Sequence, residues 1–137
     1  MMTDIYDHKK RSEIMGRVRA TNTKPENLVR RIAHGLGYRF QLYRDDLPGK
    51  PDLVFPRHGK VIFVHGCFWH GHKNCRKAKR PATNRAFWHR KLSRNIERDQ
   101  QNIVALKESG WKTLVIWECE TQDPDRVEQV IRRFFEF

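Results

Sequence analysis

The chain has 137 residues, enough for one domain with a hydrophobic core and too few for two. Its 28 lysines and arginines outnumber its 16 acidic residues, and the formal net charge of +12 indicates a polyanionic partner such as nucleic acid. No apolar run of about 18 residues is present to cross a membrane, and the N-terminus lacks the apolar segment of a signal peptide. Three cysteines without a signal peptide favour a reducing cytoplasm over disulfide bonds.

The first elements in chain order are an arm and a helix. Residues 1–21 show no strong periodicity and are interpreted as a basic N-terminal arm, followed by a single domain over residues 22–137. Thr23 and Glu26 form a capping-box pattern with a proline in the first turn, which predicts a helix as far as about Leu36. Apolar residues recur along this segment at helical spacing.

The rest of the chain alternates between strand and helix patterns. The predicted elements are strands over residues 38–43, 52–55 and 61–65, a loop over 66–83, a long basic helix over 84–109, a strand over 112–117 and a last amphipathic helix after Asp123 and Pro124. The order of helix, three strands, helix, strand and helix predicts an α/β domain with a mixed sheet flanked by helices.

Basic residues are concentrated in two segments of this pattern. Residues 9–31 hold eight lysines or arginines against two acidic residues, and residues 73–98 hold ten against one. Such blocks are often no more than a solvated face of a helix, but that interpretation leaves the net excess unexplained. We therefore favour contact with nucleic acid.

The loop over residues 66–83 contains a cluster of soft metal ligands. Cys67, His72 and Cys75 are spaced C-x4-H-x2-C, and Cys119 follows the strand over residues 112–117. Three thiolates and one imidazole complete a tetrahedral zinc site and leave no open position for chemistry, so the predicted site is structural. The same loop holds His70, and from sequence alone the two histidines could exchange roles.

Asp52 follows a proline at the start of one strand, and the next strand ends in Phe63, Val64 and His65. This layout resembles the PD-(D/E)xK nucleases, in which an aspartate and the following strand hold a divalent ion at the scissile phosphate. The usual acidic residue and lysine of the second strand are missing here, so the ion would depend on Asp52, a backbone carbonyl, phosphate oxygens and water. Mg²⁺ suits such a set of oxygen ligands. A Pro-Asp pair by itself is more often a solvated turn, but its position beside the ligand-rich loop favours a site.

Longer motifs carry a more specific resemblance. Over residues 8–120, nearly the whole domain, the chain resembles the very short patch repair (Vsr) DNA mismatch endonucleases. The matching segments are Leu47-Pro-Gly-Lys-Pro-Asp52, Val61-Ile-Phe-Val-His-Gly-Cys-Phe-Trp-His70, Pro81-Ala-Thr-Asn-Arg-Ala-Phe-Trp88, Asn95-Ile-Glu-Arg-Asp99 and Gly110-Trp with Val115-Ile-Trp-Glu-Cys119. The resemblance implies a restriction-endonuclease-like fold with a structural zinc. It also implies an enzyme that nicks DNA beside the thymine of a T:G mismatch, the lesion left when 5-methylcytosine deaminates.

The resemblance assigns catalytic roles to individual residues. Asp52 and the backbone carbonyl of Val64 would hold the catalytic Mg²⁺. His70, paired with Glu26, would orient or deprotonate the attacking water. The leaving-group side is assigned to His65 and Asp99.

Further residues are assigned to DNA and to zinc. The implied aromatic wedge at the mismatch consists of Phe68, Trp69 and Trp88. The implied zinc ligands are Cys67, His72, Cys75 and Cys119. We also expect DNA contacts from Lys24, Arg85 and Asn95.

Several of these residues have a simpler interpretation. Glu26 occupies the third position of a helix whose cap is Thr23, and a side chain folded back onto that cap cannot reach a water. Asp99 can pair with Arg94 or Arg98 on its own helix. Trp117, like Trp111, is interpreted as a packing residue. Val64 stands where relatives have a threonine, but only its carbonyl is required.

The function expected from the sequence is Mg²⁺-dependent, strand-specific mismatch nicking in very short patch repair. Two alternatives are a zinc-containing DNA-binding module without catalysis and a restriction-type endonuclease that cuts matched DNA. We expect a monomer in the cytoplasm of a prokaryote, associated with the nucleoid. Functional coupling to a cytosine-5 DNA methyltransferase, a repair polymerase and mismatch-repair proteins is a further expectation.

Overall fold

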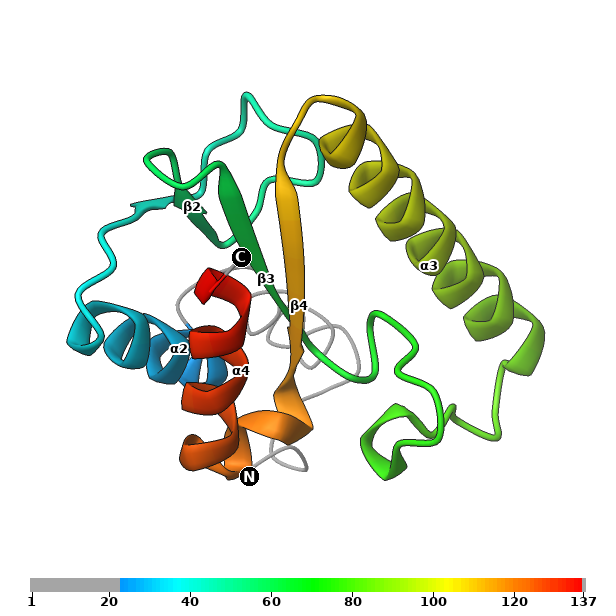
Figure 1. Cartoon of the computed structure of the whole chain (residues 1–137). Coiled ribbons are helices and arrows are strands. Elements are labelled where there is room, and N and C mark those ends of the chain that lie inside the picture. Colours follow the sequence, from blue (N-terminus) through cyan, green and yellow to red (C-terminus); the bar gives the residue numbers. More distant parts are fainter. Residues whose placement is uncertain (1–22, 137) are drawn as a thin grey trace.

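A four-stranded mixed sheet forms the centre of the computed structural model, which describes residues 23–136 (Figure 1). The strands are β1 (Gln41–Leu42), β2 (Leu53–Phe55), β3 (Lys60–His65) and β4 (Lys112–Trp117), in the order β1-β2-β3-β4. β1, β2 and β3 pair antiparallel, whereas β3 and β4 pair parallel. The mixed sheet is therefore as predicted, while the basic arm expected over residues 1–21 lies outside the described residues.

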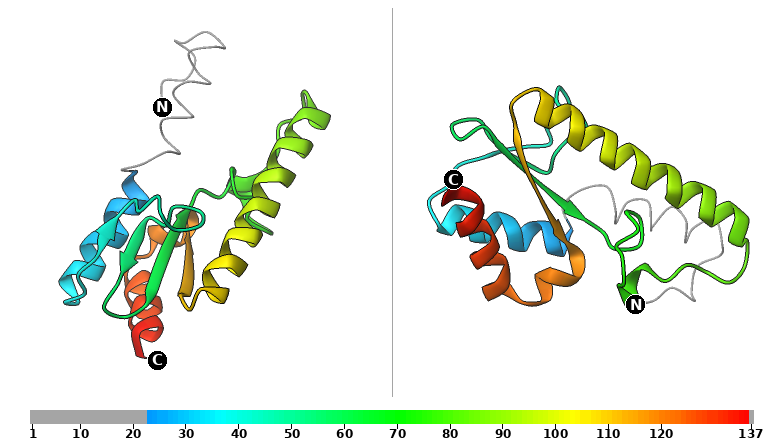
Figure 2. Two further views of the ribbon diagram at one scale, coloured as in Figure 1. Left: turned by 90° about the horizontal axis from the view of Figure 1, so that it is seen from above. Right: turned by 45° about the vertical axis from the view of Figure 1, so that its right-hand side comes forward.

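Helices cover both faces of the sheet. The helices are α2 (Lys24–Gly35), α3 (Arg85–Glu108) and α4 (Pro124–Glu136), with short 3-10 helices η2 (Arg76–Ala78) and η3 (Glu118–Gln122). α2 and α4 lie together on one face, and the C-terminal half of α3 covers the other (Figure 2). Within residues 23–136, no helix has the length and apolar character needed to span a membrane.

β3 is buried on both faces because it separates two hydrophobic cores. Ile62 packs in the core beneath α2 and α4, whereas Val61 and Phe63 pack in the core beneath α3. Successive side chains of a strand point to opposite faces, so a strand covered on both sides is apolar at nearly every position. The continuous apolar run at residues 61–64 is explained by this position.

The predicted bounds hold closely for the long elements. α2 begins directly after its predicted cap Thr23, whose hydroxyl accepts a hydrogen bond from the Glu26 amide, and β4 has the predicted bounds. The strand predicted over residues 38–43 is wrong in length, because only Gln41 and Leu42 pair. Tyr43 has a φ of 52°, a left-handed conformation that ends the strand.

The loop after β3 lies against α3, and together with the N-terminal half of that helix it projects beyond the sheet (Figure 2). Gly71, with a φ of 62°, makes this approach possible. A Cβ atom at this position would lie 2.4 Å from Cδ1 of Ile96 on α3. The glycine is therefore required both for its backbone conformation and for the close contact.

We predict that Gly71→Ala lowers the free energy of unfolding by about 1–3 kcal/mol, because the added methyl group meets Ile96 and the backbone is left-handed. Gly35→Ala is the matched control, since a Cβ atom at this last residue of α2 has nothing within 4 Å. Urea denaturation of both variants measures the difference. Equal stabilities of the two variants would contradict the predicted contact.

Candidate active site

Asp52 lies just before β2 with its carboxylate directed at the end of β3. Its Oδ2 accepts a hydrogen bond of 2.6 Å from the backbone N–H of Val64. The N–H and C=O of one strand residue point to the same side, so the Val64 carbonyl also faces the Asp52 side. Continuing the β2–β3 register by two residues places Pro51 opposite Val64, and a proline has no N–H to donate to that carbonyl. A carboxylate and a backbone carbonyl thus come together as oxygen ligands.

A second carboxylate, that of Glu26 on α2, lies beside Asp52. Glu26 is 3 % exposed, and its Oε2 accepts hydrogen bonds from Nη2 of Arg30 and from the hydroxyl of Tyr43. The pKa of Asp52 is raised to about 7, mainly by burial; the Val64 amide lowers it, and the neighbouring Glu26 contributes to the rise. Two adjacent carboxylates and a carbonyl suit a divalent cation that prefers oxygen ligands.

His70 and Asp99 form the second half of the site. Nδ1 of His70, on the loop after β3, lies 2.5 Å from Oδ2 of Asp99 on α3. When Nδ1 carries the proton in this contact, Nε2 is left as a proton acceptor. The imidazole is therefore held in the tautomer that a general base requires.

His65, at the end of β3, stacks on His70 with 3.8 Å between the ring centroids and 6° between the planes. Burial lowers the pKa of His65 to about 3; the neighbouring His70 lowers it too, while Asp99 raises it. His65 is consequently neutral near pH 7. It is suited to hydrogen bonding rather than to giving up a proton from an imidazolium.

A groove of about 290 Å³ joins these two halves. Its lining includes Asp52, Val64, His65, His70 and Asp99. The segment before β2, the end of β3, the following loop and α3 each contribute to it, so every catalytic residue predicted for the site except Glu26 lies along one groove.

The second cluster contains three cysteines and one histidine. The ligand atoms of Cys67, His72, Cys75 and Cys119 all lie within 4.8 Å of one another. Nδ1 of His72 is 3.5 Å from Sγ of Cys119, and the His72 ring stacks on Trp117 at 4.2 Å. Burial raises the pKa of Cys67 to about 12 and also raises that of Cys119, so a bound cation would favour the thiolate form of these two cysteines. Three sulfur ligands and one nitrogen fit a closed tetrahedral zinc site.

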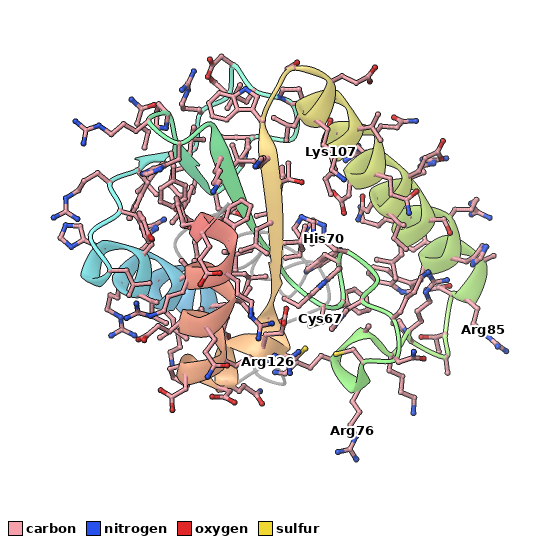
Figure 3. All side chains as sticks on the ribbon, viewed as in Figure 1. Cys67, His70, Arg76, Arg85, Lys107 and Arg126 are labelled. Carbon is pink, nitrogen blue, oxygen red and sulfur yellow. The ribbon has the colours of Figure 1, made fainter. Side chains whose placement is uncertain are left out.

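The choice between the two histidines is made by the fold. His72 lies with the cysteines, whereas His70 lies with His65 and Asp99. Figure 3 labels Cys67 and His70 on the loop that follows β3, with Arg76 and Arg85 pointing outward.

The resemblance implied a pairing of His70 with Glu26, whereas the structure brings His70 to Asp99. His70 contacts Asp99, and Glu26 contacts Arg30 and Tyr43. The physical reason is that the loop carrying His70 is held against α3, on the opposite face of the sheet from α2. Asp99, for its part, contacts this histidine and not an arginine of its own helix.

Aromatic rings gather where the loop meets the start of α3. Trp88 lies 5.5 Å from Phe68 and 6.1 Å from Trp69 between ring centroids, and Phe87 lies 5.2 Å from Trp88. Phe87 is 51 % exposed and the other three are half-buried. The predicted wedge residues Phe68, Trp69 and Trp88 therefore form one cluster near the surface.

The other predicted DNA contacts lie on two helices, Lys24 at the start of α2 and Arg85 and Asn95 on α3. Lys24 and Arg85 are exposed. Asn95 donates a hydrogen bond of 3.2 Å to the carbonyl of Trp69 and lines the groove with Asp52. Trp111 and Trp117 make the packing contacts predicted for them: Trp111 packs against the core beneath α3.

Sequence reasoning missed Arg30 and Tyr43, the two partners of Glu26. Arg30 was detectable, because it lies four residues after Glu26 on the same helix face. Tyr43 lies 17 residues away, beyond the end of α2 and after β1, and nothing in the sequence indicates that contact.

Comparison with known proteins gives consistent matches. A family model described as DNA mismatch endonuclease Vsr matches residues 3–77. The chain is 44 % identical to the type II nicking enzyme V.XorIIP of Xanthomonas oryzae pv. oryzae, over 98 % of each chain. It is 39 % identical to the type II nicking enzyme V.NmeAIP of Neisseria meningitidis, over 96 % of each chain. It is 38 % identical to the DNA mismatch endonuclease Vsr of Escherichia coli, over 92 % of this chain and 80 % of that one.

We predict that affinity for Mg²⁺ rises with pH up to about pH 7 and is constant above it. Below its pKa of about 7, the Asp52 carboxyl holds a proton that a cation must displace. The half-saturating Mg²⁺ concentration should therefore fall by about tenfold per pH unit as the pH rises towards 7.

Calorimetry in two buffers of different ionisation enthalpy measures both the affinity and the number of protons released. Asp52→Asn, which has no carboxyl to titrate, should bind Mg²⁺ much more weakly and release no proton from this position, whereas Asp45→Ala, at an exposed aspartate, should behave as the unaltered protein. An affinity that is independent of pH, with no proton release, would contradict the prediction.

Proposed function

Because this chain belongs to the Vsr family and is a DNA mismatch endonuclease, we propose that it nicks one strand beside the thymine of a T:G mismatch left by deamination of 5-methylcytosine. The family implies a restriction-endonuclease-like fold, in keeping with the mixed sheet. The observation that carries the proposal is the meeting of Asp52, the Val64 carbonyl and the His70–Asp99 pair in one groove.

Asp52 and the Val64 carbonyl would hold Mg²⁺, with Glu26 as the neighbouring carboxylate. Bound there, the ion would neutralise charge on the scissile phosphate. The chain's part is to present ionised oxygens, because the carboxyl of Asp52 gives up its proton near pH 7. The Val64 amide holds that carboxylate in one orientation.

His70 would take the proton of the attacking water at Nε2. Asp99 holds the ring by accepting from Nδ1, which fixes the tautomer and stabilises the imidazolium that forms. His65, stacked on His70 and neutral, would donate a hydrogen bond to a phosphate oxygen on the leaving-group side. A neutral partner is required there, since a second imidazolium would oppose proton uptake by His70.

The cluster of Cys67, His72, Cys75 and Cys119 would bind Zn²⁺ as a structural ion. Four protein ligands leave no position for substrate, and the groove residues lie outside the cluster. The ion would fix the loop that carries both His70 and the aromatic residues.

Phe68, Trp69 and Trp88 would enter the base stack at the mismatch. Separating a base step costs a few kcal/mol, and less where the pair already stacks poorly. That difference selects a mismatch without a complete set of base-edge contacts.

The net charge of +12 supports binding to DNA phosphates, with Lys24, Arg85 and Asn95 among the contacts. We propose that the protein acts as a monomer in the cytoplasm of a prokaryote, at the nucleoid. A cytosine-5 DNA methyltransferase would supply the base whose deamination creates the substrate, and a repair polymerase and mismatch-repair proteins would follow the nick.

Asp52→Ala should lower the nicking rate on a T:G duplex by more than about a hundredfold, because it removes the side-chain oxygens that hold Mg²⁺. Duplexes labelled on either strand, with T:G, T:A or C:G at the test position, measure the rate with Mg²⁺ and with a chelator. Asp45→Ala, at an exposed aspartate of the same connection, is the matched control and should retain activity. Cutting of both strands of matched DNA would indicate a restriction-type enzyme, and binding without cleavage a DNA-binding module.

Replacing both Phe68 and Trp69 by alanine should reduce the preference for T:G over T:A by about tenfold, since base–aromatic stacking is lost. Affinity for a matched duplex should change less, because phosphate contacts remain. Nicking rates on the two duplexes and gel-shift affinities measure the two effects. If the double variant kept the full preference for T:G over T:A, the proposed role of these two rings in mismatch selection would be contradicted.

A further inference from the structure

We propose that Arg30 and Tyr43 are positioning residues that hold the Glu26 carboxylate beside Asp52, an inference that rests on the proposed function of the Asp52 site. Glu26 lies on the face of α2 that turns inward with Val29 and Ala33, both fully buried. A carboxylate on such a face is costly unless hydrogen bonds and an opposite charge compensate it. The two positioning residues supply both.

The contacts converge on one atom. Oε2 of Glu26 accepts from Nη2 of Arg30 and from the hydroxyl of Tyr43. The same Nη2 also donates to the Tyr43 hydroxyl, and the guanidinium carbon lies 5.2 Å from the centre of the tyrosine ring. Each donor therefore restrains the other as well as the carboxylate, and we call the three residues the Glu26 clamp.

The clamp decides between two orientations of the Glu26 side chain. As the third residue after the cap Thr23, a glutamate here ordinarily folds back onto the backbone amide of the cap. A side chain in that orientation is turned towards the helix start. In the clamp it instead points to Arg30 and Tyr43 and lies close enough to Asp52 to raise the pKa of that carboxyl.

The backbone of Tyr43 supports a functional role for its side chain. Tyr43 follows β1 with a φ of 52°, a conformation that is uncommon for an aromatic residue. Such a conformation costs free energy and persists where the surrounding contacts require it. Here it ends β1 after two residues, and the Tyr43 hydroxyl reaches α2.

Tyr43→Phe tests the clamp by removing a single hydroxyl. We expect Mn²⁺, as a probe of the Mg²⁺ site, to bind about tenfold more weakly, the effect of losing one hydrogen bond to a charged group. Electron paramagnetic resonance follows Mn²⁺ binding without turnover, and the Mg²⁺ dependence of single-turnover nicking should shift by the same factor. Tyr38→Phe is the matched control, because Tyr38 stacks on Phe135 away from the groove and should leave both measurements unchanged.

The decisive comparison is a double-mutant cycle with Glu26→Gln. If Tyr43 acts through Glu26, Tyr43→Phe should have little further effect once the carboxylate is gone. An equal weakening in both backgrounds would show a merely structural role and overturn the inference. So would unchanged Mn²⁺ affinity in Tyr43→Phe or in Glu26→Gln.

Arg30 provides an independent second variant. Arg30→Met should weaken Mn²⁺ binding, and Arg30→Lys should restore part of the loss, because it keeps the charge without the planar fork. If Arg30→Met and Arg30→Lys weakened Mn²⁺ binding equally, the positioning role of Arg30 would be overturned. Failure to nick T:G duplexes by the unaltered protein would count against the proposed function alone, since the Mn²⁺ titrations still measure the clamp.

Discussion

The parallel pairing of β3 and β4 is the constraint on which the rest of the structure depends. Pairing in this direction places His65 opposite Trp117 and brings the C-terminal ends of both strands to the same edge of the sheet. Cys67 and Cys119 follow those ends, so residues 52 positions apart in the chain lie close enough to share one ion. The loop anchored in this way carries His70 to Asp99 and the aromatic residues to the start of α3.

The ligand atoms of the cysteine–histidine cluster and of the Asp52 groove suit different roles. Sulfur and imidazole ligands surround a closed position that is suited to structure, whereas carboxylates and a backbone carbonyl face a groove that a phosphate can enter. The end of β3 reads Phe63-Val64-His65, without the acidic residue and lysine of the usual pattern. Glu26, brought in from α2 on the other face of the sheet, supplies the additional carboxylate.

Burial shifts the pKa values of Asp52 and His65 in opposite directions, so that both neutral and charged forms are available in the groove near pH 7. The pKa of Asp52 rises to about 7 and that of His65 falls to about 3, in both cases mainly because a charged form is poorly solvated there. One histidine of the stacked pair is thereby kept neutral, while the other has a carboxylate partner in Asp99. The net positive charge favours binding to DNA, while the proposed chemistry uses these few poorly solvated groups.

Local patterns in the sequence determined the order of elements, the bounds of α2, α3 and β4, the sulfur ligands and the importance of Asp52, because caps, periodicity and ligand spacing act over a few residues. Only the tertiary structure decided that His72 joins the cysteines and that His70 pairs with Asp99 rather than Glu26. It also decided that Tyr43 reaches Glu26. Those contacts join residues of different elements. Which residues meet depends on how the helices pack on the sheet, and the local spacing of residues does not determine that packing.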